Sequence, residues 1–171
     1  MPKEGTISRN NEYRESAMQD ITNYFQMTEL VATSGQPTEP QFADIAAAGF
    51  TAVVNLAMPD NEHALANEGS IVSGHGMTYV HIPVPWEAPS VDHLNQYLGV
   101  MQAFKRRQVW VHCVVNARVS AFNYHYLKHG LGLSEKSCRS PLLNKWQENM
   151  EPVWQEFLKI PRDQMTALGP A

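Results

Sequence analysis

The sequence predicts an α/β domain with a mostly parallel central sheet flanked by helices. Short apolar runs rich in β-branched residues alternate with segments of helical periodicity along most of the chain. After the last apolar run, only segments of helical periodicity follow. Strands that alternate with helices in this way are typical of a parallel sheet. Ligands of such sheets bind at the carboxyl ends of the strands, so we expect the functional residues there.

The predicted strands share a high content of apolar and β-branched side chains, which favour extended structure. They cover residues 30–33, 51–56, 77–82 and 109–113. The predicted helices are placed by caps and by apolar residues at helical spacing. Thr38 is a candidate N-cap for a helix that Gly49 ends, and Ser90 is one for a helix that reaches Arg107. The remaining helices are expected at residues 61–73, 117–128, 134–147 and 151–158.

The length and composition of the chain indicate one globular domain. With 171 residues, of which 43% are hydrophobic and 18% charged, the chain is large enough to bury a substantial core. We expect this domain to cover residues 28–160. Residues 1–27 are expected to form a short helix or a partly ordered arm, and residues 161–171 a loose tail.

Charge and composition argue against several classes of function. The formal net charge of −4 leaves no surplus of Lys and Arg for binding nucleic acid. No apolar run approaches the length of a membrane span, and the polar N-terminus does not resemble a secretory signal. Two cysteines are typical of a reducing compartment, and the scattered histidines lack metal-ligand spacing. We therefore expect a cytoplasmic protein that needs neither a metal nor another cofactor.

The stretch from 109 to 120 carries the most informative chemistry. An apolar strand ends in Cys113, a short loop follows, and Arg118 and Ser120 lie at the expected start of the next helix. Backbone N–H groups and the helix dipole converge on an anion at such a junction, and they stabilise a thiolate there. Cys113 is therefore our candidate nucleophile, and Arg118 the candidate ligand for an oxyanion.

A free cysteine at the end of a core strand is more often a small buried hydrophobic residue. The neighbours of Cys113 favour a function instead. His112 precedes it, and Asn116 tolerates the left-handed conformation that an anion-binding loop requires. Cys138 has no such neighbours and is expected to pack against a terminal helix.

The His-Cys pair, the following loop, Arg118 and Ser120 resemble the protein tyrosine phosphatase superfamily. The resemblance is greatest to a small bacterial branch of dual-specificity-like domains, including those fused to β-lactamase-like hydrolases. It extends over residues 34–38 (Ser-Gly-Gln-Pro-Thr), 48–56, 83–89 (Pro-Val-Pro-Trp-Glu-Ala-Pro) and 112–120. The resemblance implies a cysteine-phosphatase-like fold and hydrolysis of a phosphomonoester on a phosphorylated protein or small molecule.

The resemblance also implies a role for each residue of the motif. Cys113 would attack phosphorus, Ser120 would stabilise the departing thiolate, and His112 would orient the loop or only pack at the strand end. The phosphate would be held by Arg118 and by the loop, that is, by Val114, Val115, Asn116 and Ala117. No partner protein or oligomeric state is implied.

The resemblance further implies a general acid in the loop between the strand and the helix that precede the Cys113 strand, here residues 83–92. Glu87 is the first candidate, because it lies in the middle of the proline-rich segment 83–89, beside Trp86. Asp92 and Asp60 are the alternatives, although Asp92 could only favour a helix dipole. An exposed loop carboxylate without a catalytic role is the competing interpretation for each.

The spacing within the motif departs from the superfamily pattern. Four residues separate Cys113 from Arg118, where the superfamily has five, while Ser120 keeps its place seven residues after the cysteine. Rhodanese-like sulfurtransferases often have the shorter spacing, so a persulfide-carrying enzyme is one alternative. A module that binds an oxyanion without turnover is another, because Arg118 is displaced and the loop lacks the usual glycines.

Overall fold

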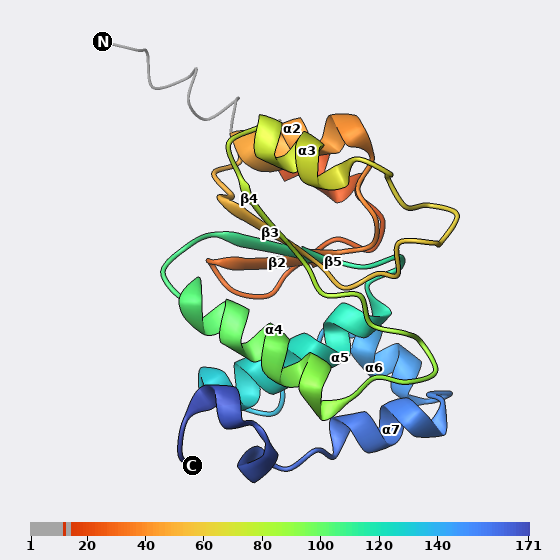
Figure 1. Cartoon of the computed structure of the whole chain (residues 1–171), viewed down its shortest axis with the longest axis vertical. Helices are drawn as coiled ribbons and strands as arrows, with labels where there is room; N and C mark the ends of the chain where they lie inside the picture. The colour runs from red at the N-terminus through yellow and green to blue at the C-terminus, as the bar shows by residue number, and fades with distance from the viewer. Residues whose placement is uncertain (1–11, 13–14) are drawn as a thin grey trace.

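A computed structural model describes residue 12 and residues 15–171, with a five-stranded sheet at the centre (Figure 1). The strand order is β1-β2-β5-β3-β4. The strands are β1 (Phe25–Gln26), β2 (Val31–Ser34), β3 (Ala52–Asn55), β4 (Thr78–His81) and β5 (Val109–His112). All neighbouring pairs are parallel except β1 with β2, which are antiparallel. The predicted fold class is confirmed, whereas the short strand β1 was not predicted.

Helices cover both faces of the sheet (Figure 1). One face carries α2 (Glu39–Ala47) and α3 (Glu68–Gly74). The other face carries α4 (Val91–Ala103), α5 (Ala117–His125), α6 (Pro141–Gln147) and α7 (Pro152–Leu158). Five residues of π-helix, Tyr126–Gly130, extend α5. None of the helices in the described part of the chain is both long and apolar enough to cross a membrane.

The alternation of side chains along β5 separates two cores. Trp110 packs in a cluster with residues of α2 and α3, such as Phe42. Val111 packs in a second, larger cluster with residues of α4, α5 and α7. Because β5 lies between β2 and β3 and is covered on both sides, all four of its residues are buried. This central strand therefore gives the segment that follows it a rigid starting point.

Two predicted helices begin later in the structure than the sequence indicated. The helix expected at 61–73 begins at Glu68 and ends at Gly74, and the chain before it, residues 59–67, forms turns and irregular structure. The helix expected at 134–147 begins at Pro141, where the Ser140 hydroxyl accepts a hydrogen bond from the N–H of Leu143 and caps it. Cys138 lies before this helix and is buried.

The tail expected to be loose is packed. Residues 162–164 and 166–168 form two turns of 3-10 helix. Met165 is fully buried between them, and Asn95 of α4 hydrogen-bonds to the backbone of Gln164 and Ala167. At the other end of the chain, residues 15–19 of the expected arm are helical, whereas residues 1–11 and 13–14 lie outside the described residues.

The buried His125 in α5 should make the stability of the fold sensitive to acid. Burial lowers the pKa of His125 to about 4, although its ring hydrogen-bonds to the carbonyl oxygen of Phe157. The unfolded chain therefore binds this proton more readily between pH 6.5 and about 4, so stability falls as the pH drops through that range. We expect a loss of about 2–3 kcal/mol in the free energy of unfolding. Denaturant titrations at several pH values measure it, and His125→Gln, which cannot titrate, should remove this part of the pH dependence.

Candidate active site

Cys113 directly follows the central strand, at the carboxyl edge of the parallel sheet. Its backbone N–H donates to the carbonyl oxygen of Ser34, the last residue of β2, over 3.3 Å. The side chain is 1% exposed and belongs to the larger core cluster. Cys113 therefore lies at the end of a core strand, as expected, and its role as the nucleophile stays a prediction.

The loop after Cys113, residues 114–116, turns into α5 through a left-handed residue. Asn116 has φ +71°, the conformation for which its side chain was expected to be suited. Its Nδ2 donates to the carbonyl oxygen of Asn23 over 2.8 Å and to Thr33 Oγ1 over 3.1 Å. These bonds fix Asn116, the one residue of the loop that has a positive φ.

The carbonyl groups of the loop are held by the surrounding framework. The N–H of Gln36 donates to the oxygen of Val114 over 3.0 Å, and Asn23 Nδ2 donates to the oxygen of Val115 over 2.9 Å. Among the described residues, the loop N–H groups of Val114 and Val115 have no hydrogen-bond acceptor, and neither do those of Ala117 and Arg118 in the first turn of α5. Free N–H groups at a helix N-terminus form an anion-binding environment.

The Arg118 side chain is buried and unpaired within the described structure. It is 9% exposed, its Nε has no hydrogen-bond partner, and its guanidinium stacks over the Trp86 ring at 5.3 Å from the centroid. A buried cation without a hydrogen-bonded counter-charge is costly. A planar guanidinium of this kind has the geometry to bind an oxyanion.

Trp86 brings the proline-rich segment 83–89 to the site. Its ring lies 5.4 Å from that of Trp146 in α6 and 5.1 Å from that of Trp154 in α7, centroid to centroid. Trp154 Nε1 also donates to the carbonyl oxygen of Trp86 over 3.0 Å. The two terminal helices therefore fix this segment over Arg118, a role that the sequence did not reveal for either tryptophan.

The three candidate acids occupy different places. Glu87 is exposed and follows Trp86, which stacks on Arg118. Asp92 lies in the first turn of α4, and Asp60 is exposed in the turn after β3. Only Glu87 belongs to the segment that contacts Arg118, so it stays the first candidate for the acid.

The hydroxyl of Ser120 is used within the helix. Its Oγ donates to the carbonyl oxygen of Ala117 over 2.7 Å, and the side chain is 5% exposed. A hydrogen bond from Ser120 to a thiolate would require this hydroxyl to rotate away from Ala117. The predicted role of Ser120 stays a prediction.

His112 points to the opposite face of the sheet from the larger core. Its Nε2 lies 2.6 Å from Glu68 Oε1, and both side chains are buried. The other carboxylate oxygen of Glu68 accepts a hydrogen bond from Gln36 Nε2 over 2.7 Å. The sequence did not reveal Glu68, because no spacing relates it to Cys113. The one feature that could have indicated it is a single acidic residue at the start of a short helix.

The close packing of Gly35 against the loop allows a steric test of the loop conformation. A Cβ atom there would lie 2.5 Å from the carbonyl oxygen of Val114 and 2.9 Å from Thr22 Cγ2. We expect Gly35→Ala to lower the free energy of unfolding by about 1–3 kcal/mol and to weaken oxyanion binding. Denaturant unfolding and calorimetry with tungstate measure the two effects. Gly99→Ala in α4, whose Cβ would meet nothing closer than 3.9 Å, is the control and should not destabilise the protein.

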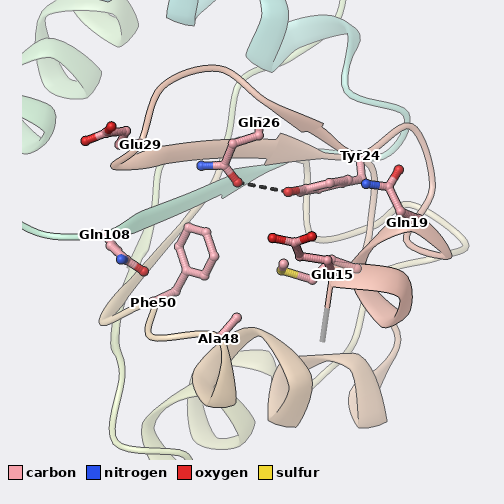
Figure 2. Close-up of a pocket in the computed structure, with 9 residues that line it drawn as sticks. Glu15, Gln19, Tyr24, Gln26, Glu29, Ala48, Phe50 and Gln108 are labelled. Carbon is pink, nitrogen blue, oxygen red and sulfur yellow. Dashed lines mark hydrogen bonds between the residues drawn. The ribbon is translucent and has the colours of Figure 1, made fainter. Parts of the chain in front are cut away.

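A separate pocket of about 500 Å³ lies at the amino ends of the strands (Figure 2). Phe50, which precedes β3, and Gln108, which precedes β5, contribute to it, and Glu15 and Tyr24 line its other side. Because Cys113 follows the opposite end of β5, this pocket is distinct from the candidate active site.

Comparisons with known proteins agree with the geometry. A family model described as a DSP-PTPase phosphatase fused to NAD+ kinase matches residues 2–126. A DUF442 protein of Shewanella putrefaciens CN-32, described as a phosphatase, is 32% identical, with 84% of this chain and 93% of that chain covered and a TM-score of 0.75. No curated protein matches this chain.

Two further solved structures share the fold at lower identity. Tk-PTP in its active form is 24% identical, with 82% of this chain and 96% of that chain covered and a TM-score of 0.66. Pseudomonas aeruginosa TpbA in complex with pTyr is 15% identical, with 88% and 92% covered and a TM-score of 0.67.

Proposed function

The chain belongs to the DSP-PTPase family of phosphatases, and we propose that it hydrolyses a phosphomonoester through a phosphocysteine on Cys113. The main support is the unpaired, buried guanidinium of Arg118, which lies at the same helix N-terminus as the free loop N–H groups. Together they form a preorganised environment for the charge of a phosphoryl group in the transition state.

The proposed reaction has two steps. The Cys113 thiolate attacks phosphorus, the bond from phosphorus to the ester oxygen breaks, and the general acid donates its proton to that oxygen. A water molecule then attacks the phosphocysteine, gives a proton to the same carboxylate, and releases phosphate and the thiolate. The N–H groups of the loop and Arg118 would bind the equatorial oxygens in both steps.

The substrate is proposed to be a phosphorylated protein or a phosphorylated small molecule. TpbA was crystallised with pTyr, which supports a phosphomonoester as the substrate class for this chain. A sulfurtransferase stays the alternative for the chemistry of Cys113, because the four-residue spacing to Arg118 is the observation that favours it.

Turnover of aryl phosphates tests the proposal. We expect the protein to release phosphate from p-nitrophenyl phosphate, and acid quenching during turnover should trap a phosphoryl group on the Cys113 peptide in mass spectrometry. With thiosulfate and cyanide, we expect neither thiocyanate nor a persulfide. Thiocyanate formation without phosphate release would favour the sulfurtransferase, and tungstate binding without any turnover would favour a binding module.

Substitution of Glu87 tests the assignment of the acid. With phenyl phosphate, whose leaving group needs a proton, we expect Glu87→Gln to lower kcat by about 10²-fold. With p-nitrophenyl phosphate, whose leaving group is a weak base, the loss should be smaller. Asp92→Asn and Asp60→Asn are the matched controls in steady-state assays. A selective loss for phenyl phosphate in either of them would transfer the role from Glu87 to that residue.

A further inference from the structure

One buried carboxylate joins the two motifs that surround the loop. Glu68 Oε1 lies 2.6 Å from His112 Nε2, and Glu68 Oε2 accepts a hydrogen bond from Gln36 Nε2 over 2.7 Å. His112 directly precedes Cys113, and the backbone N–H of Gln36 holds the carbonyl oxygen of Val114. Glu68, at the first position of α3, therefore contacts the framework on both sides of the candidate nucleophile.

The environment of Glu68 keeps it ionised. Its burial raises the pKa of the carboxyl group, but the hydrogen bond and the charge of His112 lower it, and so do hydrogen bonds from Gln36 and Tyr79. The net effect is a lowered pKa, so Glu68 carries a negative charge at neutral pH. Asn55 Nδ2 donates to the Tyr79 hydroxyl over 3.1 Å, which orients that hydroxyl.

Both ring nitrogens of His112 face acceptors. Nε2 faces the Glu68 carboxylate, and Nδ1 lies 3.3 Å from the carbonyl oxygen of Cys113. Only the doubly protonated imidazolium can donate to both at once. The Phe42 ring of α2 packs against it edge-on, and the residues paired with His112 in the neighbouring strands, Ser34 of β2 and Asn55 of β3, are also uncharged. Of these residues, Glu68 alone carries a charge.

We propose that Glu68 is a positioning residue that holds His112 as an imidazolium, which in turn stabilises the adjacent Cys113 thiolate. Glu68 touches neither the substrate nor the reacting atoms and acts through His112. Glu68 also binds the side chain of Gln36, and the backbone N–H of Gln36 keeps the Val114 carbonyl in place. In this arrangement the imidazolium supplies the charge. The proposal rests on the proposed function, because a thiolate on Cys113 is needed only if this residue is a nucleophile.

The pH dependence of Cys113 alkylation tests this role without any turnover. We expect Glu68→Gln, which keeps the shape and an acceptor oxygen but loses the charge, to raise the pH of half-maximal alkylation by iodoacetamide by about one unit. Peptide mass spectrometry separates Cys113 from Cys138. Glu62→Gln removes the same charge from a side chain that is 86% exposed, so it is the matched control and should leave the midpoint unchanged.

The outcomes separate the role of Glu68 from the proposed function. A raised midpoint in a protein without phosphatase activity would support the role and contradict the function. An unchanged midpoint in folded Glu68→Gln, together with phosphatase activity of the wild type, would contradict the role. If the variant does not fold, the His112 ring resonances of the wild type decide: a doubly protonated ring at neutral pH supports the role, and a neutral ring overturns it.

Discussion

Replacing Cys113 with serine is expected to lower kcat for aryl phosphates by at least about 10³-fold while leaving oxyanion binding intact. The serine hydroxyl is a far weaker nucleophile than a thiolate, so the phosphocysteine cannot form. The loop N–H groups and Arg118 are unchanged, so the affinity for tungstate or phosphate should stay within a few fold. Steady-state assays with p-nitrophenyl phosphate measure the first effect, and calorimetry with tungstate measures the second.

Cys138→Ser is the matched control for this experiment. Cys138 is the other cysteine of the chain, it is also buried, and its Sγ contacts the carbonyl oxygen of Leu133 rather than any residue of the loop. We expect this variant to keep wild-type kcat. Comparable activity of Cys113→Ser and the wild type would contradict the proposed nucleophile, whatever the effect on binding.

The sequence was sufficient to predict the layered fold because its strands are short and almost purely apolar. The runs around Val54 and Val111 become neighbouring central strands, buried on both faces. The helix after the loop was also predictable, since Asn116 suits a left-handed turn and begins it. Helix boundaries were less predictable where tertiary packing decides them, as at Ser140, whose side chain caps a helix expected to begin at residue 134.

Most of the candidate site was predictable because its residues are contiguous in the sequence. The loop from Cys113 to Arg118 could be recognised because strand, loop and helix follow one another. Glu68 could not, because it approaches His112 from 44 residues away, through the packing of α3 on the sheet. Trp146 and Trp154 lie about 60 residues after Trp86, and nothing in their spacing indicates that they hold the segment of Trp86.

The contact between Gly35 and Val114 explains why the Ser-Gly-Gln-Pro segment accompanies the cysteine loop. Gly35 forms an isolated antiparallel bridge with Val115, and its missing side chain leaves room for the Val114 carbonyl. With this carbonyl engaged by Gln36, the peptide plane after Val114 is fixed, and the N–H of Val115 is fixed with it. Gly35 thus contributes to the shape of the loop from the neighbouring segment.

Replacing Arg118 with alanine is expected to lower kcat/KM for aryl phosphates by about 10³–10⁴-fold, because the guanidinium would stabilise the charge of the phosphoryl group in the transition state. Arg118→Lys keeps the charge but loses the planar fork and the stacking on Trp86, so we expect it to recover only a small part of the activity. Unlike Cys113→Ser, both variants should also weaken tungstate binding in calorimetry.

The same substitution should separate function from stability. Arg118 is 9% exposed and its buried Nε has no hydrogen-bond partner in the described structure, so the fold gains no ion pair from this guanidinium and bears the cost of the unpaired Nε. We therefore expect Arg118→Ala to unfold at the same denaturant concentration as the wild type or at a higher one, although a cavity opens beside Trp86. Added phosphate should stabilise the wild type and not the variant, because only the wild type gains a counter-charge. A strongly destabilised Arg118→Ala, with phosphate stabilising both proteins equally, would mean that Arg118 serves packing and that the oxyanion binds elsewhere.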